Sequence, residues 1–133
     1  MKLNCVLLID DDEATNFLHK LVIQRSGYAE EIVAYQNAEE ALSYLGTEKS
    51  GRYPQPDLIF LDINMPRMNG WEFMDAYAGL SEEQRGKVVV MMLTTSLNPD
   101  DKEKANGIEN ITGFLTKPLT KQMLEGVLEE HFN

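Results

Sequence analysis

The chain has 133 residues, below the ~150 usually allotted to one domain, so we expect a single domain over residues 1–133 with no output domain. Its 43% hydrophobic and 26% charged residues are typical of a globular protein rather than a disordered or membrane one. A formal charge of −10 disfavours nucleic acid as a partner. A lone cysteine, Cys5, and the lack of a signal peptide or of a spanning run of ~18 apolar residues predict a cytoplasmic protein without membrane partners.

Strand-like and helix-like segments alternate along the chain. The strand-like segments are short and mostly apolar, and the helix-like ones carry apolar residues at helical spacing. In chain order these are a strand at residues 5–9, a helix at 13–26, a strand at 31–35, a helix at 38–45, a strand at 58–61, a helix at 70–77, a strand at 88–93, a helix beginning at 98, a strand at 111–116 and a helix at 119–128. The apolar stripe of the first helix includes Phe17 and Leu18, and His19 is expected on the surface. The loop from Gly46 to Pro56 is longer than expected, and the sequence suggests no function for it.

This strict alternation predicts a parallel sheet with helices on both faces. Each crossover between parallel strands is right-handed, and each helix must bury its apolar stripe against the sheet. We therefore expect an α/β fold in which a doubly wound, five-stranded parallel sheet is flanked by five helices. In such open sheets the functional site lies at the carboxyl ends of the strands.

Four of the predicted strands end in polar side chains. The residues that follow them are Asp10, Asp11 and Asp12, then Asp62, then Thr94, and finally Lys117. Neighbouring carboxylates repel one another unless a cation lies among them, and oxygen ligands without His or Cys suit Mg²⁺, with Mn²⁺ as the alternative. A hydroxyl and an ammonium group would complete a site for a phosphoryl group. Asp62, at the end of a central strand, is then the candidate nucleophile toward phosphorus.

Four segments together resemble the receiver domain of bacterial two-component response regulators, in its stand-alone, chemotaxis-regulator-like form. The segments are Val6–Asp12, Asp62–Gly70, Met92–Thr94 and Phe114–Pro118. The resemblance covers nearly the whole chain. It implies the flavodoxin-like receiver topology, with strand order 2-1-3-4-5. It also implies a signalling domain that catalyses only its own phosphorylation and dephosphorylation, rather than an enzyme acting on other substrates.

The resemblance implies that Asp62 is the phosphoacceptor and that a histidine kinase or a His-containing phosphotransfer protein supplies the phosphoryl group. It further implies that Asp11, Asp62 and the backbone carbonyl of Asn64 bind Mg²⁺ directly. Asp10 would bind the metal mainly through a water molecule. Asn64 and Ser96 would flank the route of a hydrolytic water and tune the lifetime of the acyl phosphate.

The same resemblance assigns the switching residues. Thr94 would hydrogen-bond the phosphoryl group, Lys117 would pair with it, and the peptide bond before Pro118 would be cis. Phe114 holds the aromatic switch position. Phosphorylation would then alter the surface formed by the last two predicted helices and the strand between them, where an unidentified downstream protein would bind. Trp71 is expected near the mouth of the site, where its fluorescence would report metal binding or phosphorylation.

Other interpretations share parts of this pattern. A metal-dependent phosphatase of the aspartyl-phosphate kind also uses a strand-end Asp, but it has a second acid two residues later, where this chain has Asn64. A flavin-binding domain can have the same scaffold, but three acids after the first strand would repel its phosphate. Stabilisation of the following helix explains Asp12 as well as a role in the strand-end site does. Thr95 and Ser96 remain alternatives for the role given to Thr94.

Overall fold

A computed structural model describes residues 2–85 and 88–132 and contains a five-stranded parallel sheet. The strands are β1 (Leu3–Ile9), β2 (Ala29–Tyr35), β3 (Leu58–Leu61), β4 (Val89–Thr94) and β5 (Gly113–Thr116). Their order across the sheet is β2-β1-β3-β4-β5, which confirms the predicted topology. Because every neighbouring pair is parallel, the carboxyl ends of all the strands lie at one edge of the sheet.

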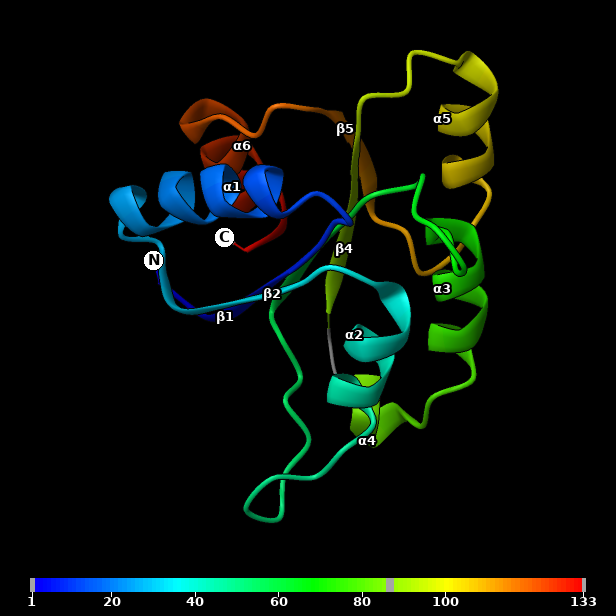
Figure 1. Ribbon diagram of the computed structural model, residues 1–133. Helices are drawn as coiled ribbons and strands as arrows, with labels where there is room; N and C mark the ends of the chain where they lie inside the picture. The colour runs from blue at the N-terminus through cyan, green and yellow to red at the C-terminus, as the bar shows by residue number, and fades with distance from the viewer. Residues whose placement is uncertain (1, 86–87, 133) are drawn as a thin grey trace.

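Helices cover both faces of the sheet (Figure 1). In the described residues they are α1 (Glu13–Ser26), α2 (Ala38–Leu45), α3 (Gly70–Ala78), α4 (Glu82–Arg85), α5 (Pro99–Asn106) and α6 (Lys121–His131). Helices α1 and α6 lie on one face, and α2, α3 and α5 lie on the other, so the doubly wound α/β fold is confirmed. Within the described part of the chain, none of these helices is both long and apolar enough to cross a membrane.

The three central strands of the sheet, β1, β3 and β4, are buried on both faces. Leu7 and Ile9 of β1 pack in one core cluster with Phe73 of α3, whereas Leu8 packs in a second cluster with Ile23 of α1. Alternate residues of a strand point to opposite faces, so a strand covered on both sides must be apolar at successive positions. This two-sided burial explains the continuous apolar runs in the sequence.

In the described part of the chain, α4 is one helix more than the five that the sequence predicts. It consists of 4 residues, and none of them is buried. Its amino end is fixed locally, because the hydroxyl of Ser81 accepts a hydrogen bond from the backbone N–H of Gln84 at 3.2 Å. A helix without a buried face has no apolar periodicity, so the pattern that indicates the other helices could not reveal this one.

The buried face of α1 differs from the predicted one. Phe17 and Leu18 are 61% and 59% exposed, whereas the buried side chains are Asn16, His19 and Ile23. The surface position expected for His19 is therefore wrong. Both polar side chains can be buried because each finds a hydrogen-bond partner outside the helix.

The long loop between α2 and β3 lies at the amino end of β3, so it is at the opposite end of the sheet from the strand-end residues (Figure 1). An antiparallel bridge between Lys49 and Arg52 closes its tip. The loop therefore extends away from the edge at which the polar residues meet.

Candidate functional site

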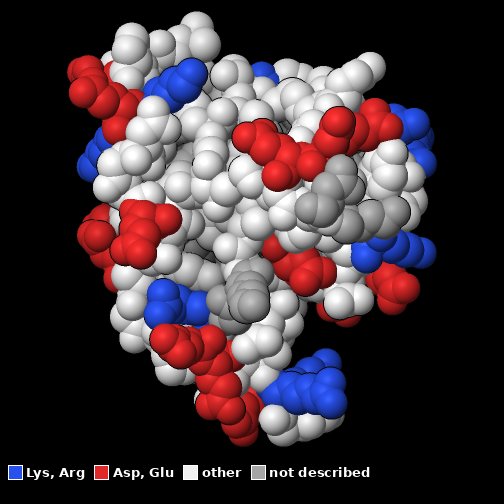
Figure 2. Space-filling view, turned by 180° about the vertical axis from the view of Figure 1, so that it is seen from behind, with Lys and Arg blue, Asp and Glu red and all other residues white. Residues whose placement is uncertain are grey.

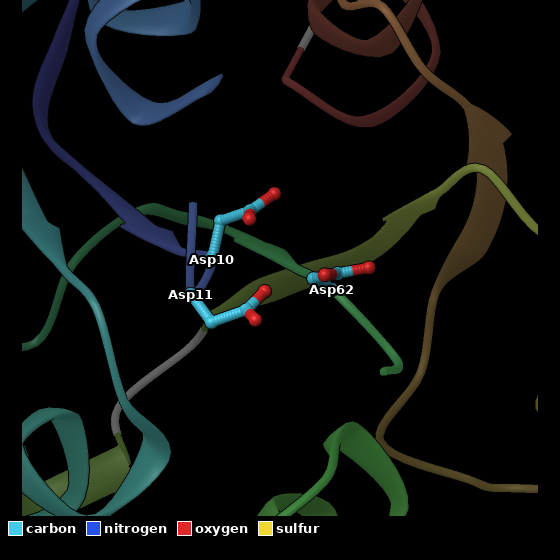
Figure 3. A group of neighbouring side chains, drawn as sticks. All are labelled: Asp10, Asp11 and Asp62. Atoms are coloured by element: carbon cyan, nitrogen blue, oxygen red, sulfur yellow. The ribbon is translucent and has the colours of Figure 1, made fainter. Parts of the chain in front are cut away.

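Three carboxylates meet at the carboxyl edge of the sheet. Asp10 and Asp11 follow β1, and Asp62 follows the neighbouring strand β3 (Figure 3). One carboxylate oxygen of each residue lies within 4.8 Å of those of the other two. Asp10 and Asp62 are only 4% and 6% exposed, whereas Asp11 faces solvent. The backbone N–H of Asp62 donates to the carbonyl of Ile9 at 3.0 Å and thereby holds the two strand ends together.

The ammonium group of Lys117 lies among these carboxylates. Lys117 follows β5, contacts the carboxylate of Asp10, and places its Nζ 3.3 Å from Oδ2 of Asp62. Its backbone N–H donates to the carbonyl of Thr94 at 2.8 Å, and the Lys117-Pro118 peptide bond is cis. Burial disfavours the charged form of Lys117, but the hydrogen bond and the charge of Asp10 outweigh burial and raise its pKa. The lysine therefore stays cationic beside Asp10 and Asp62.

The carboxyl group of Asp62 has a fixed orientation. The backbone N–H of Ile63 donates to its Oδ1 at 2.9 Å, and its Oδ2 faces Lys117. Burial and then the charge of Asp10 raise the pKa of Asp62, and Lys117 offsets this effect only in part. An oriented carboxylate beside a cation is suited to act as a nucleophile toward phosphorus.

The acidic cluster fits a hard divalent cation. Its members are all carboxylates, which are the ligands that Mg²⁺ and Mn²⁺ prefer. The ammonium group of Lys117 pairs with Asp10 and Asp62, so the repulsion among the three carboxylates is compensated only in part. The residues that could hold a metal are therefore Asp10, Asp11 and Asp62, and Asn64 lies exposed two residues after Asp62.

The hydroxyl residues that follow Leu93 differ in burial. Thr94 is fully buried, Thr95 is exposed, and Ser96 is half-buried. Oγ1 of Thr94 accepts a hydrogen bond from the backbone N–H of Ser96 at 3.2 Å. The hydroxyl of Ser96 in turn contacts the carboxylate of Asp101 in the first turn of α5. A chain of hydrogen bonds thus links the end of β4 to α5.

Phe114 and Trp71 lie on the face of the sheet that α2, α3 and α5 cover. Both are half-buried and pack against the core cluster of that face, and Phe114 is paired with Met92 of β4. Nζ of Lys104 in α5 lies 4.7 Å from the ring centre of Trp71 in α3. The structure therefore places Phe114 against this core cluster rather than among the carboxylates.

Helix α3 begins directly against the segment that carries Asp62. The backbone N–H of Gly70 donates to the carbonyl of Ile63 at 2.8 Å. A Cβ at Gly70 would lie 2.5 Å from the carbonyl oxygen of Asp62 and 3.0 Å from Cα of Ile63. Only glycine permits this approach, so Gly70 fixes the backbone on which Asp62 is presented.

Asp12 is the N-cap of α1. Its carboxylate accepts hydrogen bonds from the backbone N–H of Ala14 at 3.1 Å and from the hydroxyl of Thr15 at 2.8 Å. The first of these bonds satisfies a backbone donor that has no partner within the helix. Helix capping therefore accounts for Asp12 without a role among the metal-binding carboxylates.

Asn16 and His19 contact the site, and the sequence interpretation missed both. Nδ2 of Asn16 donates to the carbonyl of Asp10 at 2.9 Å, and Nε2 of His19 accepts from the backbone N–H of Leu119 at 3.3 Å. Burial lowers the pKa of His19, which favours the neutral imidazole that this bond requires. Asn16, His19 and Ile23 are spaced as i, i+3 and i+7. This helical spacing is the feature of the sequence that could have indicated the buried face of α1.

The fold and the strand-end residues define an α/β domain with an acidic site at the carboxyl edge of its sheet, and comparison with known proteins gives the family. A family model described as the response regulator receiver domain matches residues 6–129. The chain therefore belongs to the family of response regulator receiver domains. Among solved structures, a two-component response regulator from Cytophaga hutchinsonii is 34% identical, with a TM-score of 0.87 over 98% of this chain and 97% of that one.

Relatives of known sequence differ in length. The probable methanogenesis regulatory protein FilR2 of Methanothrix harundinacea is 28% identical over 94% of this chain and 79% of its own length. Response regulator Rcp1 of Synechocystis is 33% identical over 72% of this chain and 65% of its own length. A structure of the Mn²⁺-bound form of Rcp1 has a TM-score of 0.74 with 25% identity over 97% of this chain and 94% of that one. Several relatives are longer, and the chain spans 42% to 49% of them.

Proposed function

We propose that this receiver domain is a phosphorylatable switch in which Asp62 accepts a phosphoryl group from a phosphohistidine. An oxygen of the Asp62 carboxylate attacks phosphorus, the P–N bond of the donor breaks, and an acyl phosphate forms. The donor is a histidine kinase or a His-containing phosphotransfer protein. The observation that carries the proposal is the position of Lys117, whose ammonium group contacts both Asp10 and Asp62.

The surrounding residues have distinct roles in this proposal. Lys117 pairs with the incoming phosphoryl oxygens, and the hydroxyl of Thr94 donates a hydrogen bond to one of them. Asp11, Asp62 and the backbone carbonyl of Asn64 would hold Mg²⁺, with Asp10 acting through water. When bound, the metal neutralises charge that develops on the phosphoryl oxygens.

A protein donor and a cytoplasmic location fit the same role. One similar protein is the hybrid signal transduction histidine kinase B of Dictyostelium discoideum, of which this chain spans 7% at 28% identity. A receiver that takes its phosphoryl group from such a kinase must be in the same compartment. The lifetime of the acyl phosphate is proposed to depend on Asn64 and Ser96.

Intact-mass measurement tests the proposal directly. The protein is incubated with Mg²⁺ and acetyl phosphate, and the wild type is expected to gain one phosphoryl group. Asp62→Asn should gain none, because the attacking carboxylate is lost. Asp75→Asn, which alters an exposed acid on α3, should be modified like the wild type. An adduct that persists in Asp62→Asn, or that never forms in the wild type, would contradict the proposal.

A further inference from the structure

Helix α1 presents polar side chains to the interior at two positions where apolar ones would be usual. Asn16 and His19 are 5% and 4% exposed, and they lie on the same face of the helix as Ile23, which is fully buried. Burying a polar group costs free energy unless it forms hydrogen bonds. The partners of these two residues are therefore informative about why the polar groups are there.

Asn16 holds the end of β1. Its Nδ2 donates to the carbonyl of Asp10 at 2.9 Å and to the carbonyl of Tyr35, the last residue of β2, at 3.2 Å. The backbone N–H of Asp10 donates to the same carbonyl of Tyr35 at 3.1 Å. The backbone of Asp10 is thus fixed by α1 on one side and by the edge strand on the other.

His19 holds the segment that carries Lys117. Its Nε2 accepts from the backbone N–H of Leu119, a buried contact between residues that lie 100 positions apart in the chain. Pro118 has no N–H, so Leu119 supplies the first backbone donor after Lys117. On the other side, the N–H of Lys117 is held by the carbonyl of Thr94. The three-residue segment is therefore anchored at both ends, once by the sheet and once by His19.

We propose that His19 is a positioning residue for the phosphorylation of Asp62, because it fixes the segment from which the Lys117 ammonium reaches the reacting carboxylate. This inference rests on the proposed function. Asn16 holds the backbone of Asp10, and His19 holds the segment that follows Lys117. Helix α1 therefore supports both partners of the Asp10–Lys117 ion pair. Lys117 has a long, flexible side chain, so a fixed backbone is needed to keep its ammonium group 3.3 Å from Asp62.

Variants at position 19 separate hydrogen bonding from packing. His19→Leu fills similar space but has no acceptor, whereas His19→Gln places an amide oxygen near the position of Nε2. His19→Asn is polar but too short to reach Leu119, and it serves if the leucine variant does not fold. Phe17→Leu, at a 61% exposed position of the same helix, is the matched control.

The experiment measures two quantities for each variant, which are the initial rate of Asp62 phosphorylation by acetyl phosphate and the Mg²⁺ affinity. His19→Leu and His19→Asn should lower the rate by roughly tenfold, as expected when a group that stabilises the reaction is displaced. His19→Gln should restore most of it, and Phe17→Leu should match the wild type. The Mg²⁺ affinity should stay within about twofold throughout, since the carboxylates of Asp11 and Asp62 form no bond with His19.

Each contrary result has a separate meaning. A wild type that is not phosphorylated on Asp62 would overturn the proposed function itself. A phosphorylated wild type with an equal rate in folded His19→Leu would overturn the role of His19 alone. Equal losses in His19→Leu and His19→Gln, or a parallel loss of Mg²⁺ affinity, would reduce His19 to a packing residue and would also overturn the inference.

Discussion

Asp62 is an ionisable group in a buried position, and its surroundings oppose its charge. Burial and the charge of Asp10 raise its pKa above the ordinary value of 3.8. A carboxyl group whose pKa is higher in the folded protein than in the unfolded chain favours folding while it is protonated. This contribution is fully present only below the pKa of the group in the unfolded chain. That contribution is lost as the pH rises through the folded pKa. At neutral pH without a metal, the ionised carboxylate therefore destabilises the protein.

Asp62→Asn is accordingly expected to stabilise the metal-free protein. The amide keeps an oxygen that can accept the Ile63 N–H, and Lys117 keeps its contact with Asp10. We expect the free energy of unfolding at pH 7 to rise by about 1 kcal/mol or more, as when a buried charge is replaced by a neutral group. Urea denaturation at several pH values would measure this gain.

The pH dependence provides the control for this prediction. The difference between Asp62→Asn and the wild type should vanish at acidic pH and grow as the pH rises through the pKa of Asp62 in the folded state. A difference that stays constant over the whole pH range would show that ionisation of Asp62 is not its cause.

Among the helices of eight or more residues in the described part of the chain, α5 has the fewest buried side chains. Of its 8 residues only Ala105 is buried. Its polar contacts include the hydrogen bond from Ser96 to Asp101 and the position of Lys104 over the ring of Trp71. Such an element can change position at small cost in free energy. The link from Thr94 through Ser96 makes α5 responsive to events at the end of β4.

Trp71 should report such a change. If phosphorylation draws the hydroxyl of Thr94 away from Ser96, α5 shifts and Lys104 leaves the Trp71 ring. Wild-type Trp71 emission should then change on phosphorylation. Lys104→Ala should change much less, because it already lacks this contact, which contributes about 0.5–1 kcal/mol at exposed sites. Fluorescence with and without acetyl phosphate measures the effect.

The comparison needs a control on the same helix. Lys102→Ala removes another exposed lysine of α5 and should respond like the wild type. If the phosphorylated wild type keeps the emission and the α5-β5-α6 amide spectrum of the free protein, the proposed switch does not operate through this helix.

The sequence could predict those elements whose buried residues form a recognisable apolar pattern. The strands before Asp10 and Asp62 are continuous apolar runs, and alternation with helices fixed the edge at which these residues meet. The inward face of α1 could not be found in this way. Its apolar residues surround most of the helix, and buried Asn16 and His19 are stabilised by hydrogen bonds to segments distant in the chain. Polar partners of this kind appear only once the strands are assembled.

The molecule as a whole is acidic, and its site adds to that imbalance. The formal charge is −10, and Figure 2 shows Asp and Glu side chains spread over one face with basic groups between them. At the carboxyl edge of the sheet three carboxylates lie close together, and one lysine pairs with two of them. A divalent cation bound there would lower both the local repulsion and the net charge, so metal binding should stabilise the entire fold.

Thermal unfolding with and without Mg²⁺ would test this coupling. A ligand that binds only the folded state stabilises it by about 2.7 kcal/mol at a concentration roughly a hundredfold above Kd. Wild-type Tm should rise accordingly with Mg²⁺, and by much less with NaCl at equal ionic strength. Asp11→Ala should lose most of the Mg²⁺ effect, since it removes the exposed member of the cluster without disturbing the buried Asp10–Lys117 pair. The exposed acid Asp75 is the matched control, and Asp75→Ala should respond to Mg²⁺ like the wild type. An equal Tm shift in Asp11→Ala would mean that Mg²⁺ stabilises this acidic protein by general screening rather than by binding at the strand ends.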